Sequence, residues 1–226
     1  MLHTVLIVVL TAALAGAVVS FGLAGLRQSR RTVALARAAH EEGMLFSAED
    51  LFDVPVRYGG FILTRCGHSQ RANNITYGRM GGLPVRAFDF RYEIGHGTRR
   101  VSRHYGVIVV ETAAVLPPLT MWNRDDADYA PLAARHCEGQ AGSWCYQGDA
   151  AMARAAAAAC EGLGASAVSL QTRGSALMLC SPQPRKGYGG NWRQIAGLLK
   201  AMGQAAAPDA AADRREGDVE TPAEKC

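Results

Sequence analysis

Two kinds of side chain in this sequence could do chemistry: thiols close to imidazoles, and arginines gathered in one stretch. The tripeptide Cys66-Gly67-His68 places a thiol two residues from an imidazole. A cysteine nucleophile needs a base within hydrogen-bond reach and a third group that orients the base. Residues i and i+2 share a strand face, so the two side chains would meet only if a strand ran through the glycine. His96, between two glycines, is expected at an accessible turn. We assign no catalytic residue.

Metal binding is the second chemistry that the sequence raises. Structural zinc sites pair their ligands about two to four residues apart, and the interval from Cys137 to Cys145 is too wide for one such pair. Free cysteine is also among the most buried residue types. We therefore expect buried or incidental thiols, with no metal and no cofactor. The side chains considered for zinc are His136, Cys137, Cys145, Cys160 and Cys180.

The third chemistry is electrostatic. Nine arginines lie between Arg57 and His104, and only Asp89 and Glu93 oppose them in that stretch. Near an anionic leaflet each such arginine contributes about 1 kcal/mol to attraction. An acidic protein partner and a solvated sheet face are the alternatives. Nucleic acid is a poorer fit, because no stacking motif or helix-turn-helix spacing accompanies the charge. The residues chosen as candidates for contact with an anion or lipid are Arg99, Arg100 and Arg103.

The segments that must position these side chains alternate between apolar and polar residues from Tyr58 onward. That period of two predicts strands, and glycines separate them. The predicted strands are Phe61–Cys66, Asn74–Gly78, Leu83–Ile94 and Val101–Glu111.

The last two predicted strands form the best-defined hairpin. With a loop of Gly95–Thr98, apolar partners meet on one face and opposite charges on the other, and a slip of one residue would destroy both matches. Beyond Gly106 the second strand is apolar on both faces, which predicts a position inside the sheet. This register pairs Ile94 with Arg99, Tyr92 with Val101, Phe88 with Tyr105, Glu93 with Arg100, and Asp89 with His104.

Helices are expected before and after these strands. A helix over 30–42 should end at Gly43, and Ser47–Asp50 resembles a capping box that would start a short helix closed by Pro55. Residues 124–142 are expected to form a surface loop. The fold class is therefore α+β, a mostly antiparallel sheet with two packed helices. The later predicted elements are the strand Trp144–Tyr146, a helix from Asp149 to Glu161, the strands Val168–Gln171 and Ala176–Cys180, and a helix from Asn191 to Gly203.

The first residues, Leu2 to Leu26, carry no formal charge. As a helix they would extend roughly 37 Å, enough to cross a hydrocarbon core of about 30 Å. The alternative is a signal peptide with Ala13-Leu14-Ala15 as its cleavage site. However, the residues before the apolar run include no lysine or arginine, which a signal peptide would carry there. We therefore expect an uncleaved, single-pass transmembrane helix.

Arginines follow this apolar run and set its orientation. Basic flanks stay in the cytoplasm, which places the N-terminus outside and the rest of the chain inside. The six scattered cysteines suit a reducing compartment. Within the run, small residues recur every fourth position, which would let two copies of the helix pack as a homodimer, although an alanine-rich chain produces such ladders by chance. The flanking arginines are Arg27, Arg30, Arg31 and Arg37, and the small residues are Ala12, Gly16, Ser20 and Ala24.

The stretch Phe88–Arg100, FDFRYEIGHGTRR, resembles uncharacterised bacterial single-span membrane-anchored proteins whose β-rich domain has an FD-x-x-Y strand and a basic hairpin. The matching positions are Phe88, Asp89 and Tyr92, followed by Arg99 and Arg100. This resemblance implies an architecture, but no activity. The expected location is a bacterial inner membrane.

The expected division is a transmembrane helix at 2–26, a juxtamembrane helical segment at 27–55, a cytoplasmic α+β domain at 56–203 and a disordered tail at 204–226. Two functions are consistent with these features. The preferred one is a single-pass membrane protein whose cytoplasmic domain binds anionic lipid or a protein partner. The alternative is a membrane-tethered enzyme with a Cys/His-based site.

Overall fold

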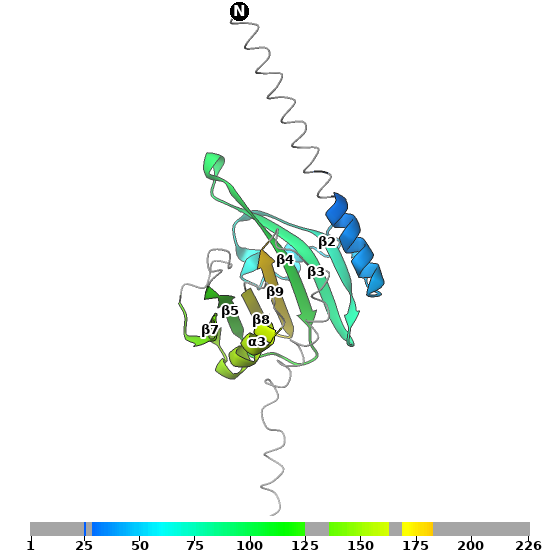
Figure 1. The fold of residues 1–226 in the computed structure, drawn as a ribbon. Coiled ribbons are helices and arrows are strands. Elements are labelled where there is room, and N and C mark those ends of the chain that lie inside the picture. Colours follow the sequence, from blue (N-terminus) through cyan, green and yellow to red (C-terminus); the bar gives the residue numbers. More distant parts are fainter. Residues whose placement is uncertain (1–24, 26–28, 125–135, 163–168, 183–226) are drawn as a thin grey trace, which may run out of the picture.

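The computed structural model describes residue 25 and residues 29–124, 136–162 and 169–182. In these residues a single nine-stranded sheet has the order β1-β2-β3-β4-β9-β8-β5-β7-β6, and every pairing is antiparallel (Figure 1). The α+β prediction of a mostly antiparallel sheet is confirmed, and β4 lies inside the sheet as its apolar faces predict.

The element bounds are as follows. The strands are β1 (Leu45–Ser47), β2 (His68–Met80), β3 (Leu83–Ile94), β4 (Val101–Glu111), β5 (Leu119–Asn123), β6 (Gly139–Ala141), β7 (Trp144–Gly148), β8 (Ser169–Arg173) and β9 (Ala176–Pro182). The helices are one over 29–41, α2 (Val54–Arg57) and α3 (Ala150–Gly162), with short 3₁₀ turns at η1 (Leu63–Arg65) and η2 (Gly97–Arg99).

Both long helices cover the same side of the sheet, which we call the helix face. Ala39 of the 29–41 helix packs into a cluster with Ile108 of β4. Opposite Ile108 on β9 is Leu179, which belongs to the cluster under α3. Alanines at 153, 156 and 157 let α3 approach the sheet closely, because they present no bulk to it. The two clusters therefore form adjoining parts of one core layer.

The other side, which we call the aromatic face, carries the large rings of the central hairpin. Successive residues of a strand point to opposite faces, so the alternate residues of β3 reach this side together. The segment 52–66, with α2 and η1, covers them. The cluster between the two layers includes Tyr58, Phe61 and Leu63 above Phe88, Phe90, Tyr92, Tyr105 and Val107.

A buried carboxylate joins the 29–41 helix to the sheet. Asp89 of β3 accepts hydrogen bonds from Arg31 Nε (2.9 Å) and Nη2 (2.8 Å). It also accepts one from Asn74 Nδ2 (2.9 Å), whose amide oxygen accepts the Thr32 hydroxyl at 2.9 Å. Asn74 reaches this position at a β-bulge of β2 with φ of +52°, a conformation that asparagine tolerates. The helix is thus fixed at Arg31 and Thr32 to one point on the sheet.

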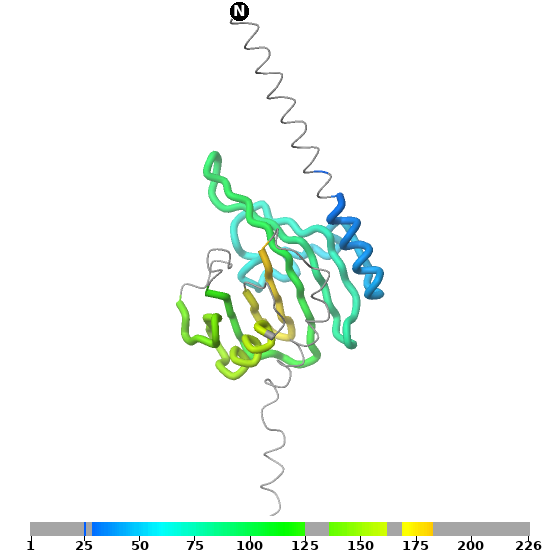
Figure 2. The backbone as a smooth tube through the Cα atoms, viewed as in Figure 1, coloured from blue at the N-terminus to red at the C-terminus, as the bar shows by residue number. Residues whose placement is uncertain are grey.

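The direction of the 29–41 helix follows from its two contacts. Its first turn lies against Asp89, in the half of β3 that leads to the β3–β4 turn. Near its end, Ala39 clusters with Val85 and Val110, at the other end of the hairpin. The helix therefore runs away from the turn, and its first residues lie on the side to which the long β3–β4 hairpin projects (Figures 1 and 2).

Several local predictions are confirmed. The helix over 29–41 ends at Gly43, where φ is +67° and the Met44 amide donates to the Ala39 carbonyl oxygen at 2.8 Å. The α3 helix follows Asp149, whose carboxylate accepts the Met152 amide at 2.7 Å as an N-cap. The predicted strands 83–94 and 101–111 are β3 and β4 with those bounds.

Two local predictions are wrong. Residues 61–66 contain the η1 turn and form no strand, because this segment covers the aromatic face and pairs with no strand. Ser47 ends β1 instead of starting a helix, so the segment 27–55 is only partly helical. The short helix α2 begins at Val54 with Pro55 in its first turn, where a missing amide costs nothing, and Asp50 accepts the Val54 amide at 2.9 Å.

Within the described residues, no helix combines the length and the apolar character needed to cross a bilayer. The predicted span at 2–26 lies outside them, apart from Gly25. The predicted helix from Asn191 to Gly203 and the tail from Gln204 also lie outside the described residues.

Replacing Asp89 with alanine should lower the free energy of unfolding by about 2 kcal/mol, because Arg31 and Asn74 lose their buried acceptor. Urea denaturation of the full chain in detergent micelles, followed by tryptophan fluorescence, measures this loss. The matched control is Glu41→Ala, which breaks the exposed Arg37–Glu41 pair at 2.9 Å and should cost at most about 0.5 kcal/mol. Equal losses in the two variants would contradict a special role for Asp89.

Candidate functional site: the basic end of the sheet

The β3–β4 turn is wider than predicted. Ile94 pairs with Val101, so each residue of β4 lies two positions from its expected partner. The reason is the η2 turn, in which the Arg99 amide donates to the His96 carbonyl oxygen at 3.2 Å. Gly95, with φ of +77°, allows the chain to turn closely, since a Cβ there would lie 2.6 Å from the Arg99 carbonyl oxygen. A shift of two keeps each side chain on its predicted face.

The predicted cross-strand partners are consequently wrong, although one predicted pair of opposite charges, Glu93 and Arg100, is still in contact. Arg100 reaches Glu93 diagonally at 3.4 Å instead of directly across the hairpin. Asp89 faces Gly106 in the register and binds Arg31, so it is not the partner of His104.

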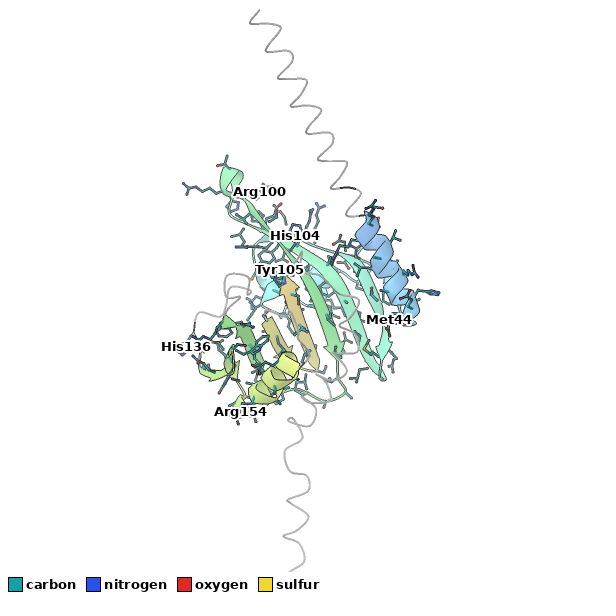
Figure 3. All side chains as sticks on the ribbon, viewed as in Figure 1. Met44, Arg100, His104, Tyr105, His136 and Arg154 are labelled. Atoms are coloured by element: carbon teal, nitrogen blue, oxygen red, sulfur yellow. The ribbon has the colours of Figure 1, made fainter. Side chains whose placement is uncertain are left out.

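Arg99 and Arg100 are exposed at the projecting turn, which we call the tip (residues 95–100; Figure 3). Val101 beside them is 49% exposed, so an apolar side chain accompanies the charges. Arg103, the third candidate, is half-buried on β4, opposite Tyr92. The three arginines therefore come from one hairpin, but only two of them lie at its extremity.

Two histidines support the base of the tip. The rings of His68 and His96 stack with centroids 4.9 Å apart and planes within 4° of each other. His68 Nε2 lies 2.8 Å from the Gly95 carbonyl oxygen, and Nδ1 lies 3.9 Å from a Glu93 carboxylate oxygen. His96 thus has a partner that the sequence does not indicate, because 28 positions separate the two histidines along the chain.

The Cys66 thiol and the His68 imidazole have separate partners. Cys66 Sγ donates to the Ile62 carbonyl oxygen at 3.2 Å, before the chain turns at Gly67, where φ is +61°. His68 begins β2 and is directed to Gly95. The strand through Gly67 that would align the two side chains does not form.

The remaining cysteines considered for zinc are distributed over the core. Cys137 and Cys145 pack beside Trp122, Cys160 lies under α3, and Cys180 lies on the aromatic face. Burial raises the pKa of the Cys145 thiol to about 11 and the pKa of the Cys160 and Cys180 thiols to about 12. Among the described residues, no three histidine, cysteine, aspartate or glutamate side chains converge as a metal site would require.

The phenols beneath the tip are fixed in the protonated form. The rings of Tyr92 and Tyr105 stack at 5.7 Å with planes within 2°. Burial raises the pKa of both hydroxyls above the ordinary value near 10. These side chains therefore act as a rigid packed base and not as acids or bases near neutral pH.

Arginines at the opposite end of the sheet bind acceptors of the protein itself. Glu111 of β4 accepts from Arg86, from Arg57 Nη2 at 3.3 Å and from the Tyr58 hydroxyl at 3.2 Å. Arg173 donates to the Gly60 carbonyl oxygen at 2.7 Å. Burial on its own would raise the pKa of Glu111, but the attraction of Arg86 and the hydrogen bonds from Arg57 and Tyr58 lower it below its usual value.

The basic stretch is thus divided between two ends. Toward the tip lie Arg65, Arg71, Arg91, Arg99, Arg100 and Arg103. The carboxylates of that end include Glu93, which binds Arg100, Asp89, which binds Arg31, and Glu49 and Asp50 of the loop after β1. Arg71, Arg91 and Arg99 of the tip end are therefore exposed and bind no carboxylate of the described residues, whereas Arg57, Arg86 and Arg173 at the other end bind protein acceptors.

Comparison with known proteins gives a fold and no family. The sequence matches no family model, and no curated protein matches it significantly. Among solved structures, the fold is similar to the crystal structure of the mycobacterial trehalose monomycolate transport factor A, TtfA, with a TM-score of 0.54. The match covers 76% of this chain and 95% of that chain at 15% sequence identity. At this identity the likeness shows a common fold alone.

Replacing Glu111 with glutamine should destabilise the protein at neutral pH by about 1 kcal/mol, because a charged acceptor of three donors is lost. A carboxylate with a lowered pKa in the folded state stabilises above its unfolded pKa, near 4.5, and loses that contribution as pH falls through the folded pKa. The difference between wild type and variant should therefore shrink below pH 4.5. Urea denaturation across the acid range measures it, and a difference that does not change with pH would contradict the assignment.

Proposed function

We propose that this chain is a single-pass membrane protein whose α+β domain lies on the cytoplasmic side and docks its tip against anionic lipid. One observation carries the proposal: the exposed arginines of the tip lie at the end of the sheet nearest to the first described residues of the 29–41 helix. A chain that leaves a membrane through 2–26 would enter the domain on that same side. The tip would then face the bilayer from which the chain emerges.

Charge and exposure at the tip support lipid as the partner. Arg99 and Arg100 are exposed, and Val101 between the tip and the sheet offers an apolar contact. Each arginine near an anionic surface contributes about 1 kcal/mol, so Arg99 and Arg100 give about 2 kcal/mol in addition to the anchor. Because the anchor already holds the domain close to the bilayer, this modest energy is enough to orient it.

The structural neighbour agrees with this proposal in a general way. TtfA is by its name a transport factor for trehalose monomycolate, so the shared fold is compatible with a domain that works beside lipid. The proposal itself depends on the residues of the tip.

The experiment uses the full chain in vesicles and measures amide hydrogen exchange over 95–104. We expect slower exchange in vesicles rich in phosphatidylglycerol than in phosphatidylcholine vesicles. Arg99→Glu should reduce this difference severalfold, because it removes one favourable charge and adds a repulsive one. High salt, about 0.5 M or more, should reduce the difference too, because it shortens the screening length.

The matched control is Arg154→Glu, the same charge change on an exposed residue of α3, far from the tip (Figure 3). It should leave the lipid dependence of the tip unchanged. Equal exchange at the tip in the two lipid compositions, or equal effects of the two substitutions, would overturn the proposal.

A further inference from the structure

Three basic side chains form a row across the sheet on the helix face. Arg71 of β2 pairs directly with Arg91 of β3, which pairs directly with His104 of β4. Directly opposed residues point to the same face with their Cβ atoms about 5 Å apart, and like charges in such pairs destabilise a sheet. All three residues are exposed. A row of this kind costs stability, so a compensating ligand is a physical explanation for it.

The row has no protein partner in the described part of the chain. Neither the two arginines nor His104 makes an ion pair or side-chain hydrogen bond with another described residue. The nearest acids on the same strand are engaged elsewhere, Asp89 by Arg31 and Glu93 by Arg100.

A cleft of about 570 Å³ surrounds the row. Its floor includes Asn73 and Asp89, and its rim includes Glu49 and Asp50 from the loop after β1. Asp50 is occupied by the amides of Phe52 (3.0 Å) and Val54 (2.9 Å), which leaves Glu49 as the rim carboxylate without such bonds. The lining thus sets Arg71, Arg91 and the His104 ring against three carboxylates, of which Asp89 is compensated by Arg31 and Asp50 accepts two amides. The field that the two arginines direct into the concave site is therefore opposed mainly by Glu49.

We propose that this cleft binds a phosphate group. Two guanidinium groups side by side can each donate a pair of parallel N–H bonds to phosphate oxygens, and the His104 ring adds a third donor. The chemistry is common to a lipid headgroup and to a soluble phosphorylated compound. The site is separate from the tip, and it requires no docking of the tip on a bilayer.

Calorimetric titration of the full chain in maltoside micelles, which contain no phosphate, tests the site with inorganic phosphate as the probe. We expect saturable binding that weakens at least about tenfold in Arg71→Gln and in Arg91→Gln, because each loses charge-assisted hydrogen bonds. Arg79→Gln is the matched control: it is also an exposed arginine of β2, but it donates to the Gly82 carbonyl oxygen at the other end. It should bind phosphate as the wild type does.

Two further readouts separate binding from a structural role. Without phosphate, Arg71→Gln should raise the midpoint of thermal unfolding, since it removes repulsion within the row, whereas loss of a structural contact would lower it. Glu49→Gln should tighten phosphate binding severalfold, since it removes the opposing charge at the rim.

A second titration with dihexanoyl phosphatidic acid distinguishes the sources of the phosphate. Tighter binding than inorganic phosphate, lost in Arg71→Gln, would support a lipid headgroup; equal binding would support a soluble phosphorylated compound. No saturable heat with either probe, or binding that Arg71→Gln and Arg91→Gln leave unchanged, would overturn the proposal. Neither result depends on exchange at the tip, so the two proposals fail separately.

Discussion

The buried carboxylate of Asp89 is the interaction on which the arrangement of this protein depends. A charge at 7% exposure is tolerable only when donors surround it, and Arg31 and Asn74 supply them. Because Arg31 is among the first described residues of the 29–41 helix, this pairing fixes where that part of the helix lies on the sheet. A hydrophobic contact would hold the helix as strongly but would specify its position less sharply, since apolar packing has no direction.

That constraint gives the two ends of the sheet different surroundings. The end at which the helix begins also bears the projecting hairpin, and its arginines exceed the carboxylates available to them. At the far end, Glu111 joins Arg57, Arg86 and Tyr58 in one partly buried network. The same residue type therefore stabilises the core at one end and remains exposed at the other. This asymmetry is the basis for the proposed docking of the tip and for the phosphate cleft beside it.

Much of the fold follows from local patterns in the sequence. Alternation defines β3 and β4 with their observed bounds, and Asp149 and Gly43 mark helix ends through bonds that span only a few residues. The predicted register of the hairpin is wrong by two residues, because the six-residue connection adopts a 3₁₀ turn. Alternation in the strands does not specify such a turn. Because the error is an even number of residues, each side chain stays on its predicted face of the sheet. The predicted core residues of β3 are therefore correct.

The candidate site was harder to predict, because its partners lie far apart in the sequence. Arg31 is 58 positions from Asp89, and no local pattern joins them. The bulge at Asn74 and the row formed by Arg71, Arg91 and His104 depend on how three strands align. Composition did locate the basic stretch. Composition did not show that Arg57 and Arg86 donate hydrogen bonds to Glu111, nor that Arg71 and Arg91 have no side-chain partner among the described residues.

The most direct test of the central claim is the depth of the two sheet ends relative to the bilayer. An environment-sensitive fluorescent amino acid would be placed at Thr98 on the tip, or at Ser175 in the β8–β9 turn at the opposite end, in the full chain reconstituted into phosphatidylglycerol-rich vesicles. With nitroxide-labelled headgroups as the quencher, the probe at Thr98 should be quenched strongly and the probe at Ser175 weakly. Equal quenching, or stronger quenching at Ser175, would contradict the account.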